Sequence, residues 1–399
     1  MTGVRRCDAC GEHLLVPFAD LGEVPIYCGA HWAGQAEAEA SPVGRMSLAH
    51  CPGCGYARNL AFDPAALVYD TTMDTNLHHS PAFQVFTAEL VKRLTERHPL
   101  RGATVLDVGC GQGEFLKELC HVAGCRGVGY DAMYAGPVGP DPSGAVLHRG
   151  HAPLGADTVP FDLVTSRHWL EHLDDPFHFL VRLRELAGDR PVRGYLEVPD
   201  AGYDLATAGW EVIYPHVSYF DGYSLCRMVE RAGWRVTAAG RLFDGMFRYV
   251  EMAAGRAASG TAGGPGTGAD ERLPGPADRD RHLASIAGFA ARHAAERDFW
   301  RASVDRLAAA GERPVLWGAG SRGVQFLHLA DPGRRLTAVV DVNPRKWGRH
   351  LPVTGHQVWP PQALTESGCR AVIITNPAYR HEIDAALRRL GVEAELMVA

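Results

Sequence analysis

The sequence lacks a long apolar run, a basic cluster and a secretory leader, and each absence excludes a class of protein. No apolar stretch approaches the roughly 20 residues that span a bilayer. The first residues, MTGVRRCDACGE, have no signal-peptide core. Lys and Arg form no long run and the formal net charge is −6, so neither nucleic acid nor an anionic membrane is an expected partner. We therefore expect a cytoplasmic protein.

What is present is the composition of a multidomain globular protein. The 399 residues are too many for one ordinary core, so two or three domains are expected. Apolar residues make up 46% and charged residues 22% of the chain. Ten cysteines in a reducing compartment argue against a disulfide framework, so clustered cysteines are better interpreted as metal ligands.

Four cysteines near the N-terminus have the spacing of a zinc site. Cys7 and Cys10 form one Cys-x-x-Cys pair, and Cys51 and Cys54 form another. Two such pairs supply the four thiolates of a tetrahedral zinc site, and a site closed by four thiolates is structural, not catalytic. Cys28-Gly-Ala-His31 offers competing ligands, and a redox pair or chance cysteines are the simpler alternative.

The segment VLDVGCGQG, residues 105–113, predicts a nucleoside site. An apolar strand ending in Asp107 is followed by a glycine turn, and a second short strand ends in Asp131. An acid at the end of that second strand can accept hydrogen bonds from ribose hydroxyls. The glycine spacing differs from the dinucleotide pattern and resembles motif I of class I S-adenosylmethionine-dependent methyltransferases; a nucleotide site of another kind is the alternative. The expected cofactor-binding residues are Asp107, Gly109, Gly111, Gly113, Asp131, Ala132, Met133, Ser166 and His168.

Two segments further along the chain place polar side chains at the same sheet edge. A strand at 161–165 leads into Ser166-Arg-His-Trp-Leu-Glu-His172, and a second strand ends Glu197-Val-Pro-Asp200. Open α/β sheets bind ligands at the carboxyl ends of their strands. Asp162 and His168 are candidates for cofactor contact, although His168 is equally compatible with a solvated loop. An aromatic segment then carries His216 among apolar neighbours, which suits either a proton acceptor or a histidine bonded to backbone.

The C-terminal third contains a second glycine turn. Residues 253–280 are rich in Gly, Ala and Pro and predict a linker or insertion, and 281–310 predict a long helix. A strand then leads into Gly318-x-Gly320-x-x-Gly323, and the next strand ends in Asp341, which together match a dinucleotide fingerprint. An NAD-dependent oxidoreductase is therefore a rival interpretation. It is weakened because no hydride-transfer residues are evident and the segment is only half of a dinucleotide fold.

These motifs, in this order, resemble a known family. The paired cysteines, the motif I glycines, Glu171-His172, the Glu197-Val-Pro strand and His216-x-Ser-Tyr-Phe together resemble the sugar C-methyltransferases that act on nucleotide-linked 4-ketohexoses in antibiotic deoxysugar biosynthesis. The resemblance implies that His216 is the base that forms an enolate, which attacks the sulfonium methyl group in line. It further implies a part for His172 near the ketone, and a C-terminal domain that encloses the substrate. The remaining expected site residues are catalytic Glu197 and Tyr214, and substrate-binding Tyr219, Gly320, Ser321, Arg322 and Asn376.

One departure from the family pattern leaves the acceptor open. The family has Tyr-x-Glu-His, whereas this chain has Tyr214-Pro215-His216, so the carboxylate beside the base is missing. Glu197 is the nearest spare carboxylate by strand position. An O- or N-methyltransferase, which needs only a proton acceptor, is the alternative to carbon methylation.

The fold expectation is therefore α/β, in three parts. Residues 1–68 form a zinc-binding domain, 69–252 a class I methyltransferase core that binds S-adenosylmethionine, and 281–399 a Rossmann-like half domain, with 253–280 as the linker. The expected partner is a small-molecule substrate, a nucleotide-linked sugar.

Overall fold

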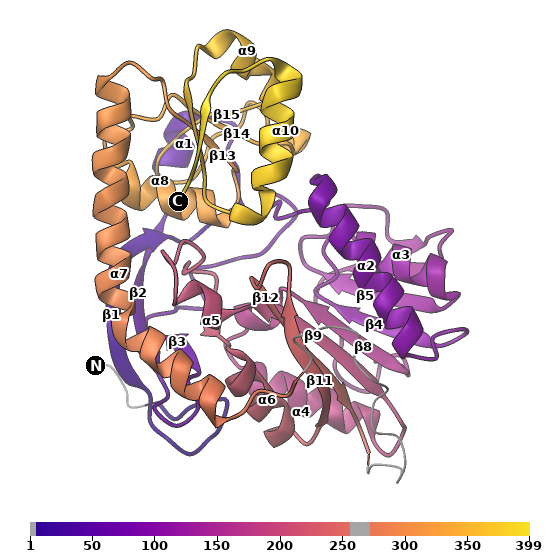
Figure 1. The fold of residues 1–399 in the computed structure, drawn as a ribbon. Helices are drawn as coiled ribbons and strands as arrows, with labels where there is room; N and C mark the ends of the chain where they lie inside the picture. Colours follow the sequence, from indigo (N-terminus) through magenta and orange to yellow (C-terminus); the bar gives the residue numbers. More distant parts are fainter. Residues whose placement is uncertain (1–4, 256–271) are drawn as a thin grey trace.

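The computed structural model describes residues 5–255 and 272–399, which form three β-sheets with helices packed around them (Figure 1). Of the linker expected at 253–280, residues 256–271 lie outside the described residues. The long helix that follows, α7 (Pro276–Ala309), begins five residues earlier than expected. Among the described residues, none of the helices is both long enough and apolar enough to cross a bilayer.

The central sheet has eight strands in the order β11-β12-β9-β8-β4-β5-β7-β6. Five neighbouring strands run parallel and β12 is antiparallel to β9, so the carboxyl ends of the parallel strands share one edge. The strands are β4 (Thr104–Val108), β5 (Arg126–Asp131), β6 (Gly139–Pro140), β7 (Ala145–Arg149), β8 (Leu163–Arg167), β9 (Arg193–Pro199), β11 (Arg235–Leu242) and β12 (Phe247–Ala253).

The helices of this part follow the apolar periodicity of the sequence. In α2 (Pro81–Arg97), the predicted apolar stripe of Phe83, Phe86, Leu90 and Leu94 is buried. The helix begins where the Ser80 side chain accepts a hydrogen bond from the Phe83 amide, with proline at the first helical position. The others are α3 (Glu114–Ala123), α4 (Pro176–Ala187), α5 (Ala201–Asp204), α6 (Gly222–Arg231) and the 3-10 turn η1 (Leu170–His172).

The N-terminal layer is a small sheet that a later segment completes. Its strands are β1 (Val16–Pro25), β2 (Val43–His50) and β3 (Ala57–Asn59), and α1 (Gln35–Glu39) lies between the first two. The fourth strand is β10 (Ser218–Tyr219), which pairs antiparallel with β3 and begins two residues after His216. The N-terminal layer and the aromatic segment therefore share backbone hydrogen bonds that the sequence pattern did not predict.

The C-terminal domain is a five-stranded sheet, all parallel, in the order β15-β14-β13-β16-β17. Its size and topology agree with the expected Rossmann-like half domain. The elements are β13 (Val315–Trp317), α8 (Ser321–Ala330), β14 (Ala338–Val340), η2 (Pro344–Lys346), β15 (Val358–Trp359), η3 (Pro361–Ala363), α9 (Leu364–Ser367), β16 (Ala371–Ile374), η4 (Pro377–Tyr379), α10 (Arg380–Leu390) and β17 (Glu395–Val398).

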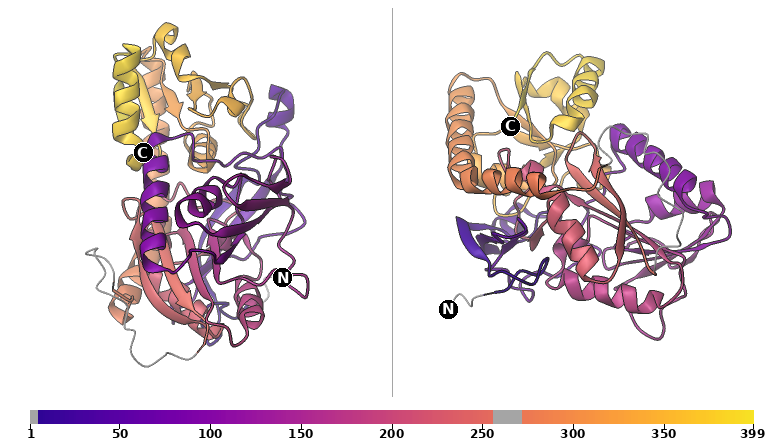
Figure 2. Two further views of the ribbon diagram at one scale, coloured as in Figure 1. Left: turned by 90° about the vertical axis from the view of Figure 1, so that its right-hand side faces the viewer. Right: turned by 60° about the horizontal axis from the view of Figure 1, so that its bottom comes forward.

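Helix α7 and backbone hydrogen bonds between the layers join the three sheets. Helix α7 packs against β1, α6 and α8, and it lies beside the N-terminal strands in Figure 1 and in the right-hand view of Figure 2. Trp32 and His350 exchange backbone hydrogen bonds of 3.0 and 2.8 Å, which tie the N-terminal layer to the C-terminal domain. All three parts consequently contribute residues to one cavity.

Candidate functional site

A cavity of about 400 Å³ lies where the central sheet, the N-terminal layer and the C-terminal domain meet. Its volume is within the range of small-molecule sites. It brings together residues from β4, β5, the end of β8, the 211–216 segment and both glycine turns. The expected site residues that line it are Asp107, Gly109, Gly111, Asp131, Ala132, Met133, His168, His172, His216, Gly320, Ser321, Arg322 and Asn376.

The first glycine turn forms one end of the cavity and fits a nucleoside. The Asp131 carboxylate accepts hydrogen bonds from the amides of Gly111 (2.9 Å) and Met133 (2.7 Å) and faces the cavity. Gly111 has φ +57° and open space at its Cβ position. A Cβ at Gly113 would come within 2.5 Å of Leu147, so this glycine serves packing and does not line the cavity. The residues present therefore fit the adenosine part of S-adenosylmethionine.

Asp107 lines the cavity next to the first glycine turn. Its carboxylate accepts a hydrogen bond of 2.7 Å from the Thr165 hydroxyl. Burial raises its pKa to about 6, and the Thr165 bond opposes that rise. Asp162, by contrast, accepts from the Thr104 amide at the opposite end of the strands and does not line the cavity.

Two histidines face each other in the middle of the cavity. The rings of His172 and His216 have centroids 5.0 Å apart. Burial lowers the pKa of each to about 3, with a further contribution to His172 from His216 and to His216 from His168. Both are neutral at physiological pH, which leaves each ring with one nitrogen that can accept a proton.

His172 is fixed by two neighbours. Its Nδ1 lies 2.9 Å from the Pro215 carbonyl oxygen and 2.9 Å from the Tyr69 hydroxyl. Because the carbonyl can only accept, that bond requires Nδ1–H and leaves Nε2 as an acceptor. In this tautomer His172 does not donate from Nε2 to a substrate oxygen.

Two carboxylates lie near the histidines, and neither is among the site residues that the sequence predicts. Glu171 is buried with both oxygens lacking a hydrogen-bond partner, and burial raises its pKa well above the usual range. The Oε1 of Glu211 lies 4.0 Å from Nε2 of His216. In the sequence, Glu171 stands out only as part of the Glu-His pair, and Glu211 has no local signal because its side chain is held by the C-terminal domain.

Glu197, the carboxylate suggested by strand position, lies behind the cavity and does not line it. It is fully buried and is bound by Arg167 (2.9 Å), His168 (2.9 Å) and the Tyr195 hydroxyl (2.6 Å). Burial would raise its pKa, but Arg167 and His168 lower it to about 2. Its place favours a supporting role, in which it orients His168.

Three other expected residues lie in the packing around the cavity. The Tyr214 hydroxyl accepts a hydrogen bond from the Asp63 amide (2.9 Å), and the Tyr219 hydroxyl donates to the Ile213 carbonyl (3.1 Å). Ser166 is buried and its hydroxyl has no partner among the described residues. All three are absent from the cavity lining.

The acid that follows the second glycine turn is already bound by other groups of the protein. Asp341 accepts from the amides of Ala319 (2.8 Å) and Asn343 (2.8 Å) and pairs with Lys346 (3.1 Å), while the Ala319 carbonyl accepts from His31. A Cβ at Gly323 would come within 2.0 Å of the Gly318 carbonyl, so helix–strand packing explains this glycine. Asn376 accepts from the Ala378 amide (3.0 Å) with its side-chain oxygen, as in a turn, and borders the cavity.

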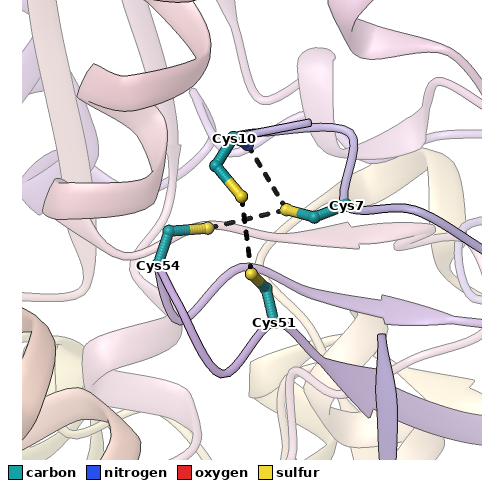
Figure 3. Close-up of side chains that lie close together, drawn as sticks. All are labelled: Cys7, Cys10, Cys51 and Cys54. Carbon is teal, nitrogen blue, oxygen red and sulfur yellow. Dashed lines mark hydrogen bonds between the residues drawn. The ribbon is translucent and has the colours of Figure 1, made fainter. Parts of the chain in front are cut away.

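The four paired cysteines converge in the N-terminal layer, as Figure 3 shows. Sγ atoms of Cys7 and Cys54 are 3.5 Å apart and those of Cys10 and Cys51 are 3.6 Å apart. Ligands of a tetrahedral zinc with Zn–S bonds of about 2.3 Å are separated by roughly 3.8 Å, so the arrangement fits the ion. The set is buried, and all four sulfurs lie within 4.8 Å of one another. The competing residues Cys28 and His31 bond to backbone carbonyls elsewhere.

The fold and the cavity define a class I S-adenosylmethionine-dependent methyltransferase. Residues 79–239 match the family model of a methyltransferase domain. Residues 278–396 match that of a C-methyltransferase C-terminal domain. The two matches together support a C-methyltransferase family for the chain, as the motif order indicated.

Individual relatives resemble only part of the chain. Ubiquinone biosynthesis O-methyltransferase of Roseobacter denitrificans is 28% identical over 132 residues, which cover 31% of this chain and 53% of that protein. The chain therefore spans about half the length of this curated relative. Among solved structures, an S-adenosylmethionine-dependent methyltransferase of Aquifex aeolicus is 17% identical with a TM-score of 0.33 and covers 44% of this chain and 94% of its own. Magnesium protoporphyrin IX methyltransferase of Synechocystis, with bound SAH, is 17% identical with a TM-score of 0.33 and covers 43% and 84%.

Proposed function

We propose that this methyltransferase methylates a carbon next to a ketone, and that its acceptor is a nucleotide-linked 4-keto-deoxysugar of natural-product biosynthesis, such as that of an antibiotic. The observation that carries the proposal is the buried, neutral His216, which shares one cavity with the nucleoside end of the methyltransferase fold. The match of the C-terminal domain to C-methyltransferases adds support.

His216 is the proton acceptor in this proposal. S-adenosylmethionine, when bound by Asp131 and the first glycine turn, supplies an electrophilic methyl group. The imidazole Nε2 takes the proton from the carbon beside the ketone, and the electron pair of that C–H bond moves onto the ketone oxygen as an enolate. The enolate carbon would then form the new carbon–carbon bond as the methyl–sulfur bond of the donor breaks, with the electron pair of that bond staying on sulfur and S-adenosylhomocysteine as the leaving group.

Glu171 suits the developing oxyanion better than His172 does. His172 presents an acceptor at Nε2, whereas the buried carboxyl of Glu171 remains protonated and has an O–H without a partner. A preorganised donor that faces a developing negative charge in a water-poor site is among the largest contributions to catalysis. His172 then serves to orient Pro215 and the segment that carries the base.

The nucleotide part of the acceptor would contact the C-terminal domain. Among the described residues that line the cavity, Arg167, Arg322 and Lys346 are each paired with a carboxylate. A diphosphate would therefore be bound chiefly by backbone N–H groups where α8 begins, a position that favours anions.

Solvent-proton exchange tests the proposal. Each of a panel of thymidine, uridine and guanosine diphosphate-linked 4-keto-6-deoxyhexoses is incubated in D2O with the enzyme. We expect deuterium at the carbon beside the ketone above the spontaneous rate, without methyl-donor turnover, and no such increase with His216→Gln. Wild-type methyl transfer to oxygen or nitrogen with no enzyme-dependent exchange would exclude carbon methylation.

O-methylation is the second candidate, favoured by the likeness of the core to the Roseobacter O-methyltransferase and by Pro215 at the family's glutamate position. For a hydroxyl acceptor His216 accepts the O–H proton, and no exchange at carbon accompanies the reaction. The exchange measurement thus separates the two candidates.

The proposal also covers the cysteines and the division of the chain into three parts. The four N-terminal cysteines hold a structural zinc in the first of three parts, followed by the methyltransferase core and the substrate-enclosing C-terminal domain. All ten cysteines are free and buried in the structure, which supports a reducing, cytoplasmic location.

A further inference from the structure

Glu211, five residues before His216, places a carboxylate close to the proposed base. Pro215 occupies the family's glutamate position and has no side-chain charge. The segment turns back on itself, with the amide of Val212 bonded to the Gly209 carbonyl and that of His216 bonded to the Ile213 carbonyl. This turn brings the Glu211 carboxylate to 4.0 Å from Nε2 of His216, and both residues line the cavity.

Both oxygens of Glu211 are held by the first turn of α8. The Ser321 hydroxyl donates to Oε1 at 2.8 Å, and Nε of Arg322 donates to Oε2 at 2.7 Å. Arg322 also bonds the buried Asp204 at 3.1 Å. One turn further along α8, the buried Gln325 donates to the Val212 carbonyl at 3.0 Å. The C-terminal domain therefore fixes the position of a carboxylate in the methyltransferase core.

We propose that Glu211 is a positioning residue for His216, and that Ser321 and Arg322 of the C-terminal domain hold it in place. The inference rests on the proposed role of His216 as base. A neutral imidazole that accepts a proton becomes a cation, and a fixed carboxylate nearby stabilises that cation. The second glycine turn then serves the base, not a dinucleotide.

Other titratable and aromatic groups around His216 also influence its protonation. His172 and Glu171 face it from η1, His168 from the end of β8, the Tyr219 ring from β10 and Arg322 from α8. Burial, followed by His168 and Arg322, lowers the pKa of His216, and a hydrogen bond to the backbone of Glu211 opposes that shift. Glu211 is the carboxylate of this group whose oxygen lies 4.0 Å from Nε2 of His216, whereas burial raises the pKa of Glu171 well above its usual range and favours its neutral form.

The first test measures His216 directly and needs no substrate. Full-length protein is treated with diethylpyrocarbonate at pH 7, and carbethoxylation of each histidine is followed by peptide mass spectrometry. We expect Glu211→Gln to slow modification of His216 at least threefold, because a neutral imidazole is more nucleophilic beside a carboxylate. Glu211→Asp, which keeps the charge, should be intermediate. The exposed His121 is the internal reference, and Glu230→Gln on the outer face of α6 is the matched control.

The second test uses proton exchange on the keto-sugar. We expect Glu211→Gln to lower kcat for exchange at least tenfold with KM within twofold, and Ser321→Ala to lower it by a smaller factor in the same direction. A change confined to KM, or to the melting temperature, would assign Glu211 a merely structural role. Full exchange activity in Glu211→Gln would overturn the proposal.

The two tests keep this inference separate from the proposed function. If wild-type enzyme exchanges no proton with any keto-sugar, the proposed function fails, and the carbethoxylation rate still decides whether Glu211 acts on His216. An unchanged His216 rate in Glu211→Gln, with affinity for S-adenosylhomocysteine intact, would overturn the inference alone. Loss of exchange in Glu211→Gln together with retained exchange in His216→Gln would assign the base to Glu211 itself.

Discussion

At the scale of single residues, Asp131 illustrates how a local pattern can specify a site. Its carboxylate ends β5, is held by two backbone amides and faces the cavity. The position of this acid beside the glycine turn can be predicted from sequence, because a strand, a glycine turn and an acid at fixed spacing are all local features. The residue therefore offers the most direct test of donor binding.

Asp131→Asn is expected to weaken binding of S-adenosylhomocysteine. Hydrogen bonds to a charged group contribute about 1.5–3 kcal/mol, which corresponds to about 10- to 100-fold in affinity. Isothermal titration calorimetry of the full-length protein measures the change. Asp157→Asn, an exposed acid in a loop, is the control, and equal affinities for the two variants would contradict the assignment.

His31 gives a pH prediction at the contact between the N-terminal layer and the second glycine turn. Its Nε2 donates to the Ala319 carbonyl (3.2 Å), and burial, followed by the nearby Lys346, lowers its pKa to about 4. The unfolded chain, with a histidine pKa near 6.5, binds the proton more readily. The stability that His31 contributes is therefore present above about pH 6.5 and is lost as the pH falls toward 4.

Wild-type protein should consequently lose about 1.3 kcal/mol more stability than His31→Gln between pH 7.5 and 5.5. Urea unfolding at the two pH values measures the difference. His121→Gln, at an exposed position in α3, should retain the wild-type pH dependence. An identical pH dependence in His31→Gln would show that His31 is not held neutral by the fold.

At the scale of elements, α8 makes the contact that connects the C-terminal domain to the segment that carries Glu211 and His216. Arg322 pairs with Glu211 and Asp204, and all three side chains are largely buried. Removing one partner of a buried ion pair leaves an uncompensated charge and costs about 3–5 kcal/mol. Arg322→Met should therefore lower the free energy of unfolding by about that amount.

The matched control is Arg388→Met, which removes an exposed pair with Asp384 on α10. Exposed pairs contribute about 1 kcal/mol or less. Chemical unfolding of both variants measures the contrast. Similar stabilities would mean that Arg322 adds no more than a surface ion pair.

The four-cysteine cluster is coupled to the segment that carries His216 by another short element. The cysteine pair 51–54 connects β2 to β3, and β3 pairs with β10 two residues after His216. Cys51→Ser should remove the bound metal, lower the melting temperature by several degrees and reduce proton exchange. Elemental analysis, thermal unfolding and the exchange assay measure the three effects. Cys369→Ser, a buried cysteine outside the set, should keep the metal, and full metal content in Cys51→Ser would exclude the four-cysteine site.

The elements also show what sequence can and cannot reveal here. The first glycine turn, the cysteine pairs and the stripe of α2 are local patterns, and each was predicted. Strand β8 was predicted at 161–165 and lies at Leu163–Arg167, because a short apolar run does not fix strand ends. Glu211 could not be found, because its position beside His216 depends on α8, over 100 residues away. Tyr214 is a predicted site residue because of its neighbours in the chain, and its hydroxyl accepts a hydrogen bond from the Asp63 amide, a contact between distant segments that no local pattern indicates.

At the scale of the whole molecule, two glycine turns of similar appearance belong to two different sheets. The first, at residues 109–113, has an acid at the end of the next strand that faces the cavity. In the second, at residues 318–323, the corresponding Asp341 is engaged by Ala319, Asn343 and Lys346. Both acids accept hydrogen bonds from two backbone amides, but Asp341 is also paired with Lys346, which a dinucleotide ribose would have to displace. The first turn is therefore the one prepared for a nucleoside.

This difference predicts the ligand selectivity of the intact protein. One equivalent of S-adenosylhomocysteine should bind, and a concentration 100 times its Kd should stabilise the fold by about 2.7 kcal/mol. NAD and NADH at millimolar concentration should bind too weakly to shift the melting temperature. Calorimetry and NADH fluorescence measure the two ligands. Asp131→Asn separates the sites, because it should weaken S-adenosylhomocysteine and leave any NADH signal unchanged. Saturable NADH binding that survives Asp131→Asn would show that the C-terminal turn is a dinucleotide site after all, and that Asp341 releases its partners when the ligand arrives.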